Sequence, residues 1–276
     1  MDAAEIEDRI AVLARADEDD IDIGEGALLL AALDRPGVGL ARYRDHLEEI
    51  TDSLGRTEAG GRTEAGGRAG ALQSVLAGEF GYAGDTRTYD DAQNANLMRV
   101  IDRRKGLPVA LGILFIHAGE SVGWPVAGLS FPFYFLIRLE DGGARTVLDP
   151  FKGGAALDTH GMREILHRMS DGRMELKPEF YEPVTKREVL MRLQNNLKTR
   201  ALESGNLARG AEILRRMVSF APMDMSLWRE LAHLEARRGN LNDAFAAAEA
   251  YFDRAETNSQ RHDAAALMEH LRKQRN

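Results

Sequence analysis

The sequence predicts an α+β domain followed by an all-α helical array, and three observations carry this prediction. An almost wholly apolar run covers residues 109–119, which is long for a strand and too short for a membrane span, so we expect a buried helix. Short β-branched or aromatic runs follow at 126–129, 133–139 and 145–148. Beyond residue 185 the apolar spacing is helical throughout and repeats at a fixed interval. A buried helix followed by an antiparallel sheet is the α+β order.

The segments around these elements divide the chain into two predicted domains. Helical spacing recurs before the buried run, at about 1–15, 25–33, 40–50, 71–80 and 90–102. Residues 55–66 repeat GRTEAG twice, and their glycines and charges predict a flexible insertion over about 52–68. Pro178 and Pro183 bracket a predicted linker. We therefore expect one domain over 1–180 and the helical array over 185–276.

Asp141-Gly142-Gly143 lies between the second and third predicted strands. An Asp-Gly pair is a strong signal for a tight hairpin, because glycine adopts the positive φ angles that such turns need. The two strands are therefore expected to pair antiparallel.

The composition excludes several functions. The 276 residues include no cysteine, so disulfides, thiolate metal sites and thiol redox chemistry are ruled out. The net charge of −8 argues against broad nucleic-acid binding. A local basic group at Arg99, Arg103, Arg104 and Lys105 is typical of a solvated helix end. With no apolar run of about 18 residues and an acidic, mixed N-terminus, we expect a cytoplasmic protein without a membrane or nucleic-acid partner.

The predicted array contains an internal repeat. Gly205-Asn206-Leu207 recurs as Gly239-Asn240-Leu241, an offset of 34, and the same offset relates Leu193 to Leu227. Thirty-four residues is the tetratricopeptide period, in which each Gly-Asn pair would form the turn between two antiparallel helices. A last helix, about 259–274, would cap the array. Since two units bury little alone, we expect them to pack on the first domain or to pair with another chain as a homodimer.

The stretch 96–154 is the most specific part of the sequence. It reads NLMRVIDRRKGLPVALGILFIHAGESVGWPVAGLSFPFYFLIRLEDGGARTVLDPFKGG, an RRxGxPxxL entry to the buried helix, then strands and an LDPFxGG segment. In this order the pieces resemble the SirB-type branch of the transglutaminase-like superfamily, whose members often carry a tetratricopeptide-like C-terminal region. The resemblance implies a papain-like helix-plus-antiparallel-sheet domain over the first part of the chain.

The resemblance also implies where a catalytic triad would lie. A cysteine nucleophile at the start of the buried helix, a histidine base on the next strands and an orienting aspartate would perform acyl transfer or amide hydrolysis. The matching positions here hold Ala110, in Leu107-Pro108-Val109-Ala110-Leu111, and Tyr134, where the family pattern is FPGHFLVR. Asp149 alone is retained. Alanine offers no nucleophile, and a phenol is a poor base at neutral pH.

Other residues could be imagined in a rebuilt site. Ser130 could be a relocated nucleophile, but a strand-end hydroxyl is the simpler interpretation. His117 lies on the buried helix, where a satisfied core histidine is expected. His160 and His167 are seven residues apart, whereas helical metal pairs favour a spacing of four, so no metal site is predicted. Asp149 has two open interpretations: a cap on the Phe151 and Lys152 backbone, or a polar pocket shared with Tyr134.

These observations predict a non-catalytic protein-binding or regulatory protein that needs no cofactor or metal. The helical array would present its surface to a protein or peptide partner. Candidate contact residues on its first helices are Asn195, Asn196, Arg200, Trp228 and Arg229. The alternative is an amidase or peptidase with rebuilt chemistry in the same cleft, using Tyr134, Ser130 and Asp149.

Overall fold

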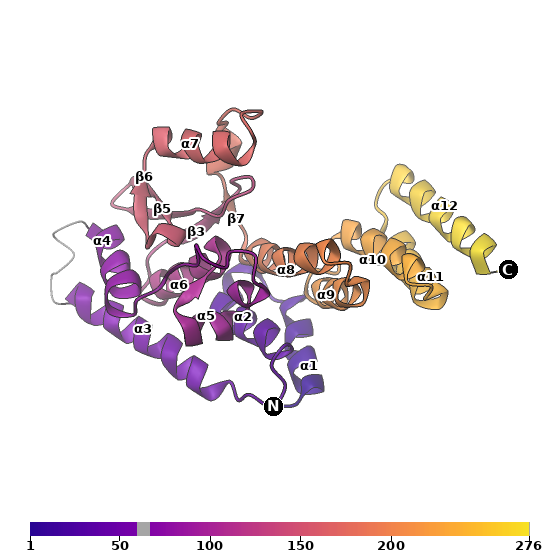
Figure 1. Ribbon diagram of the computed structural model, residues 1–276, viewed down its shortest axis with the longest axis horizontal. Coiled ribbons are helices and arrows are strands. Elements are labelled where there is room, and N and C mark those ends of the chain that lie inside the picture. The colour runs from indigo at the N-terminus through magenta and orange to yellow at the C-terminus, as the bar shows by residue number, and fades with distance from the viewer. Residues whose placement is uncertain (60–66, 276) are drawn as a thin grey trace. The chain divides into compact units, whose positions relative to one another are not determined.

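A computed structural model describes residues 1–59 and 67–275, and the chain divides into two compact units (Figure 1). Unit 1 comprises Met1–Ile6 and Asp17–Leu193, and unit 2 comprises Glu7–Ala16 and Gln194–Asn276. The division at Leu193 lies later than the predicted boundary at 180–185, because α8 (Lys186–Glu203) begins inside unit 1. Helix α1 (Ala3–Leu13) likewise contributes to both units.

Unit 1 surrounds the predicted buried helix, α6 (Pro108–Ser121). Pro108 occupies its first turn, where the missing N–H costs nothing, and ten of the eleven residues from Val109 to Gly119 are buried. Four further elements pack against it: α2 (Ile23–Ala32), α3 (Ala41–Ala59), α5 (Leu97–Arg103) and α4 (Gly67–Gln73). The remaining short helical turns of the unit are η1 (Glu18–Asp20), the π-helical η3 (Ser74–Glu79), η4 (Ala92–Ala95), η5 (Pro150–Lys152) and η6 (Pro178–Tyr181).

A five-stranded antiparallel sheet lies beside α6. Its order is β6-β5-β4-β3-β7, with β3 (Val126–Leu129), β4 (Ile137–Asp141), β5 (Ala144–Asp149), β6 (Ala155–Leu157) and β7 (Pro183–Val184). The predicted hairpin is confirmed, since β4 pairs with β5 around Gly142 and Gly143 at φ 57° and 87°. A separate parallel pair joins β1 (Ala83–Gly84) to β2 (Lys105–Gly106).

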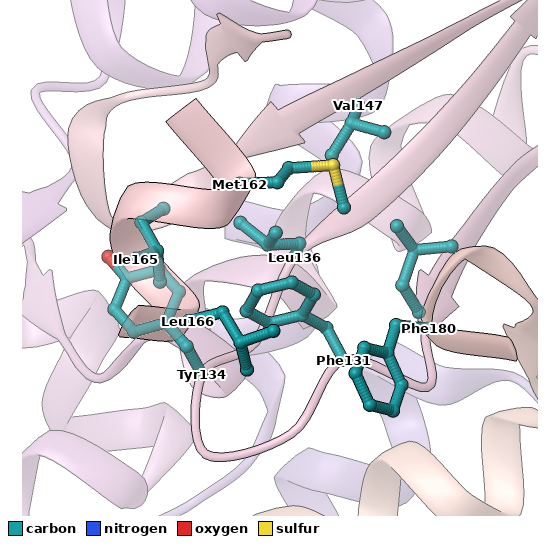
Figure 2. Packing of buried hydrophobic residues seen from close by; sticks show 9 residues of the cluster. Phe131, Tyr134, Leu136, Val147, Met162, Ile165, Leu166 and Phe180 are labelled. Carbon is teal, nitrogen blue, oxygen red and sulfur yellow. The ribbon is translucent and has the colours of Figure 1, made fainter. Parts of the chain in front are cut away.

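The two faces of the sheet are covered by different helices. Figure 1 shows α6 on one side of the sheet and α7 (Thr159–Met169) on the other. The strand alternation agrees: Gly128 and Ile137 face α6, whereas Leu129 and Val147 belong to a core cluster with Met162 and Leu166 of α7 (Figure 2).

The ring of Phe135 packs between α6 and the sheet. A Cβ built on Gly112 of α6 would lie 2.3 Å from Phe135 Cε1, and one built on Gly128 of β3 would lie 2.7 Å from its Cζ. The ring therefore fills a slot that only two glycines leave open, and it is 2% exposed. This contact holds in place the segment that precedes β4, and Tyr134 belongs to that segment.

Three sequence predictions need correction in unit 1. The strand predicted over 133–139 begins only at Ile137, because Phe133 has a φ of 62°, far from extended backbone. The insertion predicted over 52–68 is helical up to Ala59, since Leu54 is fully buried and extends the apolar face of Leu47 and Ile50, and helix resumes at Gly67. Residues 60–66 lie outside the described residues. The predicted linker between Pro178 and Pro183 instead forms η6 and leads into β7, which pairs with β3.

Unit 2 confirms the predicted helical repeat. Its helices after α8 are α9 (Leu207–Phe220), α10 (Met225–Arg237), α11 (Leu241–Arg254) and α12 (Asn258–Arg275), and each packs against the next. Gly205 and Gly239 have φ of 76° and 80°. In both turns the following asparagine N–H bonds back to a carbonyl five residues earlier, Asn206 to Ala201 at 2.8 Å and Asn240 to Glu235 at 3.0 Å. This is the glycine helix end that the repeated Gly-Asn pairs predict.

Within residues 1–59 and 67–275, no helix combines the length and the apolar character that crossing a membrane requires.

Candidate functional site

The structure joins two of the three positions that the sequence analysis singled out. The Tyr134 hydroxyl donates to Asp149, at 3.1 Å from Oδ1 and 3.3 Å from Oδ2. Tyr134 is 8% exposed and Asp149 is fully buried. Figure 2 shows the Tyr134 ring beside Ile165 and Leu166 of α7, within the core cluster. The polar pocket predicted for this pair is therefore a hydrogen bond inside the core.

Asp149 also caps the turn that follows it. Its Oδ1 accepts the backbone N–H groups of Phe151 at 3.0 Å and of Lys152 at 3.3 Å. Both interpretations left open by the sequence are therefore correct, because the same carboxylate caps the turn and accepts the Tyr134 hydroxyl. These hydrogen bonds offset part of the cost of burying the carboxylate.

Burial governs the protonation of this pair. It raises the pKa of Asp149, although the Tyr134 hydroxyl and the Lys152 and Phe151 N–H groups act in the opposite direction. Burial, followed by the nearby Asp149 carboxylate, also raises the pKa of Tyr134. A base must be unprotonated at working pH, so a tyrosine with a raised pKa is less suited to proton abstraction than an ordinary phenol.

Ala110 lies in the first turn of α6 and is fully buried. Its helix packs against η5, the turn that Asp149 caps, so the elements that carry Ala110 and Asp149 lie side by side. The helix start would favour an anion there. The methyl group, however, has no nucleophilic atom and is closed to solvent.

Two residues that the sequence analysis did not single out, Tyr89 and Arg192, complete this region together with Phe151. The Phe151 ring meets both Tyr134 and Tyr89 edge to face, with centroid distances of 6.4 and 5.7 Å. Arg192 of α8 donates to the Tyr134 carbonyl at 2.9 Å and lies over the Phe135 ring. Burial lowers the pKa of Arg192 to about 10. No spacing rule connects Tyr89 or Arg192 to the motif, because both come from distant segments.

Phe133 has an unusual backbone conformation beside the site. Its φ of 62° is rare for a bulky residue, and the Tyr134 N–H closes a three-residue turn onto the Pro132 carbonyl at 2.8 Å. The side chain is 59% exposed. The family pattern FPGHFLVR has glycine at this position. That glycine is the sequence signal for a positive φ here, which this chain keeps with phenylalanine.

The other candidates of the first unit are not brought together. Ser130 is exposed, and its backbone N–H bonds to the Glu182 carbonyl, while among the described residues its hydroxyl has no histidine or carboxylate within hydrogen-bond reach. His117 is mostly buried and lies 3.5 Å from Asp22. His160 pairs with Glu164 on the exposed face of α7, and His167 is exposed. Over residues 1–59 and 67–275, no three His, Asp or Glu side chains are grouped to hold a metal ion.

The candidate partner-binding residues of unit 2 lie on the first helices of the repeats. Asn195 of α8 and Arg229 of α10 are exposed and occupy equivalent positions, 34 residues apart. Arg229 pairs with Asp263 of α12 at 3.0 Å. Arg200 bonds to the Asn196 side chain at 3.1 Å, and Trp228 donates to the Pro222 carbonyl at 2.9 Å beneath Arg254. Asn195 and Arg229 are thus exposed to solvent, whereas Asn196, Arg200 and Trp228 are partly buried within the array.

A matched pair of substitutions at Asp149 separates its two properties, hydrogen bonding and charge. Asp149→Ala removes the acceptor for Tyr134, Phe151 and Lys152, and should lower the free energy of unfolding by about 2–4 kcal/mol. Asp149→Asn keeps an acceptor of the same shape and should cost less than about 1 kcal/mol at pH 7. Urea unfolding of the three proteins measures both values.

The pH dependence of the same variants has a predicted sign. The raised pKa means that folding favours the protonated carboxyl, so the contribution of Asp149 is greatest below 3.8, its ordinary value, and is lost as the pH rises through the folded pKa. The stability of Asp149→Asn relative to the natural protein should therefore increase from pH 3.5 to pH 7. A decrease over this range would show that the carboxylate, and not the acid, is favoured by the fold.

Comparison with known proteins gives consistent matches for both parts of the chain. The model of the transglutaminase-like superfamily matches residues 41–195, and a tetratricopeptide-repeat model matches residues 197–272. A UPF0162 protein of Xylella fastidiosa is 29% identical over 84% of this chain and 84% of its own length. Protein SirB1 of Salmonella typhimurium is 23% identical over 72% of this chain and 74% of its own. No solved structure matches this chain.

Proposed function

The chain belongs to the transglutaminase-like superfamily, in its SirB-type branch with C-terminal tetratricopeptide repeats, and from this premise we propose that it is a non-catalytic member that binds a protein or peptide partner. The observation that carries the proposal is the state of the triad positions. The nucleophile position is a buried alanine, and the base position is a phenol whose hydroxyl is engaged by the remaining aspartate. A nucleophile and a base must both touch the substrate, and neither position offers a group that can.

The repeats support the binding half of the proposal. Tetratricopeptide arrays bind peptides and partner helices on the surface formed by the first helix of each pair. In unit 2 that surface carries Asn195 and Arg229 at equivalent positions, both exposed. An amide and a guanidinium are suited to a polar or acidic segment of an extended partner.

Variants of this surface test the proposal. The double variant Asn195→Glu with Arg229→Glu should reduce capture of the partner from the native host by about tenfold or more, because central interface residues carry most of the binding energy. Glu249→Lys, an exposed residue on α11, a second helix of a repeat pair, is the matched control and should bind as the natural protein does. Equal capture by all three proteins would exclude this surface.

Two further parts of the sequence prediction stay predictions. A homodimer formed through the array would give a sedimentation velocity that depends on protein concentration. A cytoplasmic location, expected from the composition, is tested by fractionation of host cells.

A further inference from the structure

The face of the sheet that α7 covers contains an open cavity of about 760 Å³, whose lining residues do not include Tyr134 or Asp149. It lies between β4–β6, the start of α7 and the segment 176–182. Its apolar wall comes from Val147, Leu157, Met162 and Leu176. Most of the remaining lining is polar or charged, so the cavity combines an apolar patch with groups that can orient a ligand.

The charged groups around this cavity are mostly basic. Arg138, Arg145, Arg163 and Lys177 line it, against two acids, Asp158 and Glu182. Asp158 is already engaged, since it caps α7 by accepting the Gly161 N–H at 2.8 Å. The start of α7 therefore stabilises this carboxylate, and with Asp158 and Glu182 both counted the lining still has more basic than acidic side chains.

The basic residues differ in how far they are already compensated. Arg138 is held by Glu140 at 2.9 Å and by the Tyr181 carbonyl at 3.0 Å, and its covered Nε has no acceptor among the described residues. Lys177 makes only a long, exposed contact to Glu179 at 3.6 Å, which contributes little. Arg163 is exposed and forms no ion pair within the described part of the chain. Arg145 is likewise exposed and lies 3.5 Å from Glu140, which also pairs with Arg138. Arg145, Arg163 and Lys177 therefore remain available to a ligand, and the last two adjoin the apolar Met162 and Leu176 in the chain.

We propose that this cavity binds a small organic anion with an apolar body, such as an alkyl or aryl carboxylate. The apolar part would lie against Leu157, Met162 and Leu176, and the carboxylate would pair with Arg163 and Lys177. Burial of the alkyl chain supplies the favourable free energy of binding, and the charge pair fixes the orientation of the ligand. All of the lining residues belong to unit 1, so this inference does not rest on the proposed function.

Decanoate below its micellar concentration is a suitable probe, measured by isothermal titration calorimetry on the full-length protein at low salt. We expect saturable binding of decanoate at one site. Decanol and decyltrimethylammonium should bind at least about tenfold more weakly, because neither can form the charge pair with Arg163 and Lys177. A tenfold difference corresponds to about 1.4 kcal/mol. The double variant Arg163→Glu with Lys177→Glu should bind decanoate at least about tenfold more weakly. Arg99→Glu, an exposed residue outside the cavity, is the matched control and should bind as the natural protein does.

A second variant tests the apolar wall. Leu176→Trp should fill part of the cavity and weaken decanoate binding by about tenfold, while a circular-dichroism melt confirms that the variant is folded. Equal affinity for decanoate and decyltrimethylammonium, or unchanged decanoate binding in the double variant, would overturn the proposal. Absence of saturable binding by the natural protein would overturn it as well.

Discussion

A cysteine introduced at position 110 should react with iodoacetamide at least about 100-fold more slowly than a cysteine at the exposed position 130, because a fully buried side chain is alkylated only when the structure opens. The natural chain has no cysteine, so the introduced thiol is the only one that can be labelled. Ala110→Cys and Ser130→Cys are labelled under native conditions and again in urea, where their rates should become similar. The added sulfur must also fit a packed site, which should cost about 1–3 kcal/mol.

The pH dependence of that labelling distinguishes a closed site from a latent one. Burial raises the pKa of a thiol, whereas a working nucleophile has a lowered pKa, here favoured by the start of α6. We therefore expect the alkylation rate of Ala110→Cys to keep rising above pH 8.5, the ordinary thiol value. Rapid labelling with a midpoint well below pH 7 would show that only the thiol is missing and that the surrounding site is intact.

The second large effect is expected at Glu235, in the repeat array. This carboxylate is fully buried at the end of α10, where it pairs with Arg215 and with Arg238 at 2.7 Å and accepts from the Asn240 side chain at 2.9 Å. Glu235→Ala should lower the free energy of unfolding by about 2–3 kcal/mol. A fully buried ion pair would cost more, but Arg215 and Arg238 keep partial contact with water.

An exposed ion pair provides the control for Glu235. Glu269 and Lys273 are paired one turn apart on α12, with side chains 66% and 73% exposed. Glu269→Ala should leave the free energy of unfolding nearly unchanged, because exposed pairs are screened by solvent. Urea unfolding, with the midpoint followed by circular dichroism, compares the two variants. Similar losses in both would show that Glu235 acts only as an ordinary surface charge.

The elements predicted most accurately were those with a local physical signal. The apolar run of α6 predicted a buried helix without any knowledge of the elements packed against it. Pro108 indicated where that helix begins. Gly205 and Gly239 specified their turns because no other residue adopts a positive φ as easily. The motif placed Tyr134 and Asp149 on adjacent segments, which the hydrogen bond between them bears out.

What the sequence could not provide depends on contacts between distant segments. Arg192 and Tyr89 contact the site through tertiary packing, and such contacts produce no periodic pattern in the sequence. The glycine-rich duplication suggested a loop from about residue 52, yet Leu54 is buried against the core and keeps α3 helical to Ala59. Glu235 could not be recognised from the repeat, because the equivalent position in the first unit is Ala201, which carries no charge.

The most direct test of the central claim is the release of ammonia from a glutamine-containing peptide amide by the purified full-length protein, with and without hydroxylamine as acyl acceptor. We predict a rate equal to that of buffer for the natural protein and the same rate for Asp149→Asn, which keeps the fold. Protein-dependent release that Asp149→Asn abolishes would contradict the account, since it would mean that the Tyr134–Asp149 pair is catalytic and not only structural.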